Sequence, residues 1–139
     1  MIGALSRRPQ MILSAPGDAD AGLIVSITRT VTDDIAGPAG VSWTWAEEVE
    51  QHMTAVGLTD IRGFEYCRMI SGGNAACRLN DSYVRQVEPM LYDFGYSRAE
   101  IERFHEVLRD PRFRARPPFQ LVLTAGRKPE SRTSERGNQ

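Results

Sequence analysis

The sequence holds only two cysteines among 139 residues, and it has no excess of charge of either sign. Cys67 and Cys77 stand without a secretory signal, which favours reduced thiols over a disulfide framework, and their spacing differs from the CxxC pattern of a compact zinc site. With 17 basic and 18 acidic side chains, no overall field would attract the chain to nucleic acid or to an anionic membrane. The sequence therefore predicts neither a disulfide scaffold, nor a metal site, nor a polycationic binding protein.

Long hydrophobic runs are also missing. The apolar runs near the start, Met11-Ile12-Leu13 and Leu23-Ile24-Val25, are far shorter than the roughly 7–15 residues of a signal-peptide core. We therefore expect a cytoplasmic protein without a membrane segment. The contents of 41% hydrophobic and 25% charged residues are ordinary for one globular domain.

The pattern of apolar residues predicts three strands between irregular ends. Residues 1–21 show no sustained period and are predicted to be irregular, whereas Gly22–Arg29 is apolar and β-branched and predicts a buried strand. Leu58–Met69 predicts a second strand and Phe119–Ala125 a third. Residues 127–139 are charged and free of aromatic side chains, and they are predicted to be disordered.

Three helices are predicted between these strands. The first runs from Trp45 to Gly57, where a glycine can end it. The second runs from about Ser82 to Phe94 and contains a proline that should kink or divide it. The third begins at a capping box in which Ser97 pairs with Glu100, and it ends before Pro111.

Several of these stretches resemble class I S-adenosylmethionine-dependent methyltransferases. Gly22-Leu23-Ile24-Val25-Ser26 resembles the strand after a proline-glycine turn in that family, and Ala55-Val56-Gly57-Leu58-Thr59-Asp60 resembles the junction before its sixth strand. Gly95 to Ile101 and Asp110 to Phe113 resemble the helical insertion of some bacterial members. The last predicted strand ends in Gly-Arg-Lys-Pro, as in those members, so the resemblance covers residues 22–129.

The resemblance implies an α/β fold. It predicts a partial doubly wound sheet of three strands, equivalent to strands 5-7-6 of the methyltransferase fold, with an inserted helical pair. The last strand would lie antiparallel between the other two. Residues 22–126 would form this methyltransferase-like domain, between the irregular segment 1–21 and the disordered tail 127–139.

The cofactor-binding half of the family has no counterpart in this sequence. The glycine-rich turn of the family would precede Gly22, where only Gly3 and Gly17 stand, too far apart to form it. A complete family member uses S-adenosylmethionine, and we expect none to bind to this chain alone. The chain is then a fragment, a decayed copy or one half of a split enzyme.

The resemblance also implies where a small-molecule acceptor would bind. The family lines its acceptor pocket with the segment after the fifth strand and the insertion before the seventh, here about residues 30–43 and 71–83. Trp43, Asn74, Arg78 and Tyr83 are the candidate acceptor-binding residues, and ordinary packing or exposure is the alternative for each. No catalytic residue is predicted, because methyl transfer draws largely on proximity and orientation.

The histidines and an arginine-rich segment are the other candidates for chemistry. His52 and His105 lie on separate predicted helices without the spacing of a metal site, and we expect them to be structural or solvent-facing. Arg112, Arg114 and Arg116 alternate along the chain and would share one face of an extended segment. They would either bind an anionic acceptor or form a solvated connection. Nucleic-acid recognition is not expected, because the sequence lacks the aromatic and basic platform that it would need.

Three functions remain open from the sequence. The first is the acceptor-side part of a methyltransferase. The second is a non-catalytic interaction or dimerisation module, in which the unpaired edge of the Gly22–Arg29 strand binds a second copy or a complementary chain. The third is a small α+β binding protein whose likeness to methyltransferases is coincidental.

Overall fold

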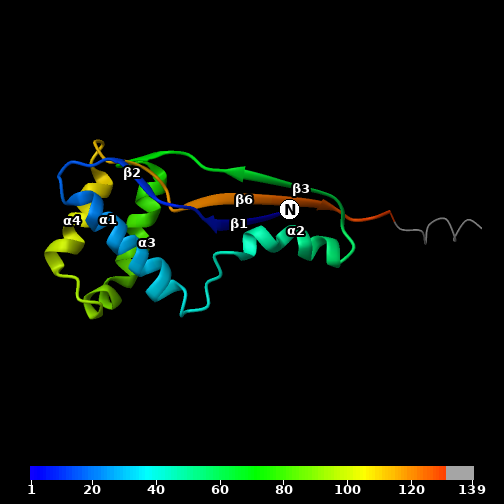
Figure 1. Cartoon of the computed structure of the whole chain (residues 1–139), viewed down its shortest axis with the longest axis horizontal. Coiled ribbons are helices and arrows are strands. Elements are labelled where there is room, and N and C mark those ends of the chain that lie inside the picture. Colours follow the sequence, from blue (N-terminus) through cyan, green and yellow to red (C-terminus); the bar gives the residue numbers. More distant parts are fainter. Residues whose placement is uncertain (131–139) are drawn as a thin grey trace, which may run out of the picture. The chain divides into compact units, whose positions relative to one another are not determined.

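The computed structural model describes residues 1–130, which form a mixed α/β structure of four α-helices, one π-helix and two three-stranded sheets (Figure 1). These elements belong to two compact units. The first, the sheet unit, contains residues 1–7, 43–66 and the chain from Gln120 onward. The second, the helical unit, contains residues 8–42 and 67–119.

The sheet unit is built from β1 (Ile2–Arg7), α2 (Trp45–Ala55), β3 (Thr59–Tyr66) and β6 (Phe119–Arg127). Its strand order is β1-β6-β3, so the last strand lies between two strands that come much earlier in the chain. Figure 1 shows β1 and β3 running opposite to β6. β1 and β3 are therefore parallel, and the chain between them, which includes α2, forms a crossover connection.

One face of this sheet is covered by α2. Gln120, Val122 and Thr124 alternate along β6 and are buried, and α2 buries its own apolar side chains Ala46, Val49 and Met53. Ser6 on β1 donates from its Oγ to Glu47 Oε1 on α2 at 2.8 Å.

The opposite face of the sheet keeps most of its apolar side chains exposed, and Leu123 is half-buried. Leu121 and Leu123 on β6 pair with Tyr66 and Phe64 on β3, whose side chains are 52% and 60% exposed. Leu5 on β1 is exposed as well. We call these five residues the open face of the sheet.

Gly22–Arg29, predicted as a strand, is a helix. It lies in α1 (Asp20–Arg29), which continues as the π-helix η1 (Thr30–Ala36). The buried side chains along both helices recur every three or four residues, which is a helical period, and they are Ile24, Ile27, Thr28, Val31 and Ile35. The β-branched composition indicated a strand, but packing on one helical face outweighs that local preference. The proposed edge strand, and dimerisation through it, are therefore wrong for this segment.

Residues 1–21, predicted as irregular, contain two strands. They are β1 and β2 (Met11–Ser14), separated by a short connection. Neither strand shows a clear alternation of apolar and polar residues, because β1 contains Gly3 and buries the polar side chain of Ser6. The tail predicted from residue 127 begins with the last residue of β6, and its residues 131–139 lie outside the described part.

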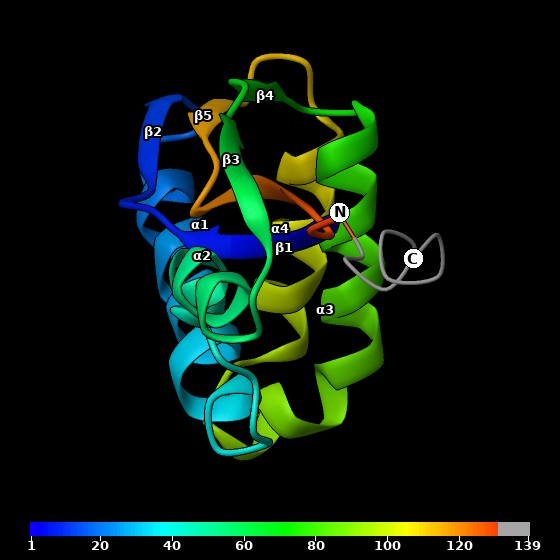
Figure 2. The same ribbon diagram turned by 90° about the vertical axis from the view of Figure 1, so that its right-hand side faces the viewer.

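The helical unit contains α1, η1, α3 (Ala75–Asp93) and α4 (Arg98–Arg109) around one apolar core. A second sheet belongs to it, in the order β2-β5-β4, with β5 (Arg114–Arg116) between β2 and β4 (Ile70–Ser71). Figure 2 shows these three strands together. The inserted helical pair predicted between the last two strands is confirmed as α3 and α4.

The two inserted helices follow the prediction to different degrees. The capping box of α4 is present: Ser97 Oγ accepts from Glu100 N at 3.1 Å, and Glu100 Oε1 accepts from Ser97 N at 3.0 Å. In contrast, α3 begins seven residues before the predicted Ser82, because Asn74 caps it. Pro89 lies inside α3 without dividing it. Among residues 1–130 no helix is both long and apolar enough to cross a bilayer.

The two cysteines should differ sharply in reactivity. Cys67 is exposed, whereas Cys77 is buried and its burial raises the pKa of the thiol to about 11. Because the thiolate is the reacting form, we expect one thiol per chain to react rapidly with Ellman's reagent at pH 8. The second should react only in denaturant, and rapid reaction of both in the native protein would contradict the burial of Cys77.

Candidate functional site

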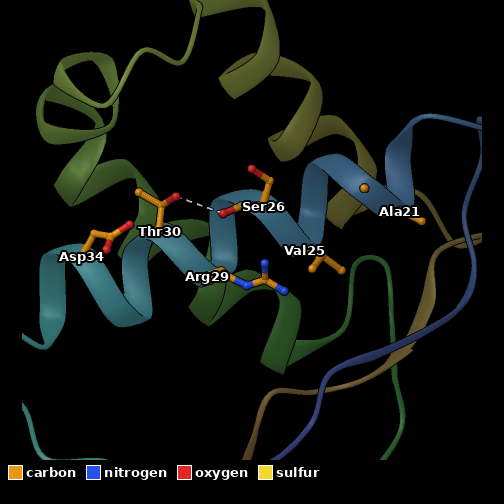
Figure 3. A pocket seen from close by; sticks show the side chains of 7 residues that line it. Ala21, Val25, Ser26, Arg29, Thr30 and Asp34 are labelled. Carbon is orange, nitrogen blue, oxygen red and sulfur yellow. Dashed lines mark hydrogen bonds between the residues drawn. The ribbon is translucent and has the colours of Figure 1, made fainter.

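A hollow of about 430 Å³ lies along α1 and the start of η1. The structure lines it with Ala21, Gly22, Val25, Ser26, Arg29, Thr30 and Asp34. In Figure 3 the Asp34 carboxylate lies beside Thr30, and the guanidinium of Arg29 extends the other way, toward Val25. The two charged groups of the hollow therefore lie apart along the helix, with the Thr30 hydroxyl near Asp34.

A second hollow of about 510 Å³ continues from the first toward α4. The two share Gly22 and Ser26, and the second is lined in addition by Ala19, Asp20, Leu23, Ala99, Glu100 and Arg103. We call the two hollows together the α1 groove. It lies wholly within the helical unit.

The helical period of α1 explains why this groove forms. The buried residues occupy one face of the helix, which leaves Gly22, Ser26 and Arg29 on the exposed face, at spacings of four and three residues. A Cβ atom placed on Gly22 would find no heavy atom within 4 Å. The absent side chain of Gly22 thus leaves open space at the point where the two hollows meet.

Three hydroxyl groups form a chain at the groove. Tyr96 Oη lies 2.6 Å from Ser26 Oγ and 2.9 Å from Thr30 Oγ1, and Thr30 Oγ1 donates to the carbonyl of Ser26 at 3.1 Å. Because Thr30 uses its only hydrogen on that carbonyl, Tyr96 must donate to Thr30, and Ser26 then donates to Tyr96. All three hydroxyl hydrogens are used within the protein, so Ser26 Oγ can offer a ligand only an acceptor.

The charged groups of the first hollow have no protein partner. Neither Arg29 nor Asp34 forms an ion pair or a side-chain hydrogen bond with any residue in 1–130. Asp34 lies in the π-helix η1, where Gly37 N donates to Thr32 O at 3.2 Å across five residues. Short π-helical segments occur often at functional sites, because the wider turn redirects side chains.

An ion pair fixes the far end of the groove. Asp20 accepts from Arg103 Nε at 2.9 Å and Nη2 at 2.6 Å, and from Gly17 N at 2.8 Å. Arg103 also donates to Glu106 at 3.1 Å. The hydrogen bonds from Arg103 hold the pKa of the Asp20 carboxyl below its ordinary value, although burial opposes them. This pair ties α1 to α4 at the far end of the groove.

The Asp20→Asn variant should lose about 2 kcal/mol of unfolding free energy at pH 7, since a charge-assisted, two-bond contact is replaced. The folded-state pKa lies below the unfolded value near 4, so the contribution is present above about pH 4 and lost as the pH falls through the folded pKa. Urea unfolding of both proteins at pH 7 and pH 3 measures this. An equal difference at the two pH values would contradict it.

The four predicted acceptor-binding residues do not line the α1 groove. Asn74 caps α3, where its Oδ1 accepts from Cys77 N at 2.9 Å. Arg78 and Tyr83 are exposed on α3, and Trp43 belongs to the sheet unit, where its carbonyl accepts from Arg7 N at 3.4 Å. A role for Asn74 as a cap is established, and the acceptor role of all four stays a prediction.

The histidines take the structural and solvent-facing roles that were predicted. His52 is exposed and its ring stacks on Trp45 at 6.4 Å between ring centroids. His105 is buried between the two inserted helices, with Nδ1 on Asp81 and Nε2 on Glu88. Both ring nitrogens are occupied, which leaves neither available as a catalytic base.

The arginine-rich segment alternates as predicted. On β5, Arg114 and Arg116 are exposed and Ala115 is buried. Arg112 precedes this strand and is held by Asp110, with Nη2 at 2.7 Å from Oδ2, and its hydrogen bonds lower the pKa of Asp110 to about 2. Arg112 is thus engaged within the protein, and a role for the other two arginines in binding anions stays a prediction.

The residues that line the groove were missed from the sequence because α1 was interpreted as a strand. A helical interpretation would have placed Gly22, Ser26 and Arg29 on one polar face. Tyr96 would still have been missed, since 66 or more residues separate it from its partners.

Comparisons with known proteins leave the site to be interpreted from its geometry. No protein-family model matches the chain, and no curated protein matches it either. Residues 1–130 contain no group of three or more histidine, cysteine or carboxylate side chains placed to hold a metal ion.

Proposed function

We propose that this chain is the C-terminal, acceptor-side part of a class I S-adenosylmethionine-dependent methyltransferase that acts on a small molecule. The observation that carries the proposal is the strand order β1-β6-β3, with the last strand antiparallel between the other two. The resemblance implies a 5-7-6 order in which Gly22–Arg29 is the fifth strand. Because that segment is helical, our proposal gives the place of the fifth strand to Ile2–Arg7.

The position of the groove supports the same proposal. With β1 as the fifth strand, the segment after it is residues 8–42 and the insertion before the seventh is residues 67–118. These are the two segments from which the family builds its acceptor pocket. The α1 groove draws α1 and η1 from the first segment and α4 from the second.

A chimera tests this function. The first four strands of a small-molecule methyltransferase, with their cofactor site, would be joined to this chain at Ile2, and S-adenosylhomocysteine binding would be measured by calorimetry. We expect binding at least tenfold tighter than to the cofactor half alone. A matched chimera joined at Gly22 should gain nothing, because it lacks β1. Equal binding by the Ile2 chimera and the bare cofactor half would contradict the proposal.

A second candidate is a non-catalytic interaction or dimerisation module. The observation that favours it is the open face, since contiguous exposed apolar side chains on a sheet mark contact surfaces. Light scattering after size exclusion tests it: the mass should rise with concentration toward a dimer, and Phe64→Ser should abolish the rise. Leu79→Ser, at an equally exposed leucine on α3, is the control. A constant monomer mass would contradict self-association.

A further inference from the structure

We propose that the α1 groove binds a small, extended molecule that carries a carboxylate at one end and an amine at the other. This inference rests on the proposed function, for which it names the class of acceptor. Arg29 would bind the carboxylate, and Asp34 together with Thr30 would bind the amine.

The charges in the groove support this class of ligand. Arg29 and Asp34 are lining residues of opposite charge, and neither is neutralised by a residue in 1–130. Arginine pairs with a carboxylate through two parallel hydrogen bonds, and a carboxylate such as Asp34 pairs with an ammonium group. A ligand with one charge only would leave one of the two groups without a partner.

The direction of the hydrogen bonds sets which end binds where. The hydroxyl chain of Ser26, Tyr96 and Thr30 has used all its hydrogens, so Thr30 Oγ1 can offer a ligand only an acceptor. The Asp34 carboxylate also accepts, and Figure 3 shows it beside Thr30. This end of the groove therefore favours a donor such as an ammonium group, which becomes a nucleophile that a methyltransferase can use once it has lost its proton.

The apolar part of the lining sets the middle of the ligand. Ala21 and Val25 line the first hollow, and Leu23 and Ala99 line the second. The volume of about 430 Å³ is in the range of roughly 300–1,000 Å³ found for small-molecule sites. Methylene groups between the two charged ends would contact these side chains.

Titration of the isotopically labelled full chain with 6-aminohexanoate tests the inference. The amide resonances of Ser26, Arg29 and Thr30 should shift and saturate, with Kd on the order of 1 mM for a ligand of this size. Hexanoate and hexylamine, which each keep one charged end, should bind at least tenfold more weakly. No saturable shift, or equal binding of the three compounds, would overturn the inference.

Variants separate the groove from general effects on folding. Gly22→Leu fills open space and removes a helical glycine, so it should keep the fold and weaken 6-aminohexanoate binding at least tenfold. Ala76→Leu, on the exposed side of α3, is the matched control and should leave binding unchanged. Arg29→Gln should reduce binding to the level of hexylamine, and Asp34→Asn to that of hexanoate. Unchanged binding by Gly22→Leu would place the ligand elsewhere and overturn the inference.

This experiment needs no cofactor, so its outcome is independent of the chimera. Binding of 6-aminohexanoate without cofactor binding in the chimera would retain the groove and reject the methyltransferase. Cofactor binding in the chimera without binding of 6-aminohexanoate would retain the methyltransferase proposal and reject the groove as the ligand site.

Discussion

Gly72→Ala is expected to destabilise the helical unit by about 3 kcal/mol or more. A Cβ atom at Gly72 would lie 1.8 Å from the carbonyl oxygen of Asp110 and 2.8 Å from its nitrogen. The clash is with backbone, which cannot rotate away as a side chain can. The loss of unfolding free energy should therefore exceed the roughly 1–3 kcal/mol that an overpacked site usually costs. Two hydrogen bonds hold this turn against the end of α4 and the chain after it: Gly73 N to Leu108 O at 2.8 Å and Gly72 N to Phe113 O at 2.9 Å.

Gly22→Ala is the matched control for Gly72→Ala. It replaces a glycine in the same unit, but one whose Cβ meets nothing within 4 Å. We expect it to stabilise the protein by about 0.5–1 kcal/mol, because alanine favours the helix. Urea unfolding followed by circular dichroism measures both variants. A change below about 1 kcal/mol for Gly72→Ala would contradict the close approach of the two backbones.

Replacing His105 with alanine should destabilise the protein by about 3 kcal/mol. His105 is 3% exposed, and it joins α4 to α3 through Asp81 and through Glu88, whose Oε1 lies 2.8 Å from Nε2. Each ring nitrogen therefore faces one carboxyl group of α3. Removal of the ring leaves both carboxyl groups without this hydrogen-bond partner. Arg85, at 3.1 Å from Asp81, remains to compensate in part.

A combined variant distinguishes the loss of hydrogen-bond partners from the loss of packing at this site. Adding Asp81→Asn and Glu88→Gln to His105→Ala replaces both carboxyl groups by amides, and it should recover at least 1 kcal/mol of the loss, an order-of-magnitude expectation for neighbouring groups that couple. Unfolding in urea at pH 7 gives both values. If the combined variant is less stable than His105→Ala, the loss arises from the cavity alone and the argument from the carboxyl groups is wrong.

Most of the elements could be predicted from local pattern, and the exceptions have physical causes. The helix near Trp45 and the last strand were found because each has one buried face and a clear start or end. The strand near Phe64 was found although none of its residues is buried. The capping box at Ser97 was found because its two residues satisfy each other locally. Each of these signals lies within a few residues of sequence.

The strands in residues 1–21 and the helix at Gly22–Arg29 were missed for a different reason. Valine and isoleucine favour strands on average, and α1 contains Ile24, Val25 and Ile27 within a few residues. What selects the helix is the tertiary contact of one face with α4, which no local pattern reports. In contrast, β1 gains its partner β6 more than a hundred residues later, so its small and polar residues gave no local sign of a strand.

The candidate site depended on the same distant contacts. The predicted acceptor residues followed from the resemblance and an assumed fifth strand at Gly22–Arg29. Once that strand is moved to Ile2–Arg7, the implied acceptor segments move to the whole helical unit, and the α1 groove lies in them. Tyr96, which completes the hydroxyl chain, comes from the loop before α4 and is brought to Ser26 by folding alone.

The measurement that tests this account most directly is the pairing of the last strand, by nuclear Overhauser contacts in the native chain. The account predicts contacts between Gly3 and the methyl groups of Leu123, whose Cδ2 would lie 3.2 Å from a Cβ at Gly3, and helical contacts throughout Asp20–Arg29. Cross-strand contacts between Gly22–Arg29 and Phe119–Ala125 would contradict it. They would remove the β1-β6-β3 order on which the proposed function rests.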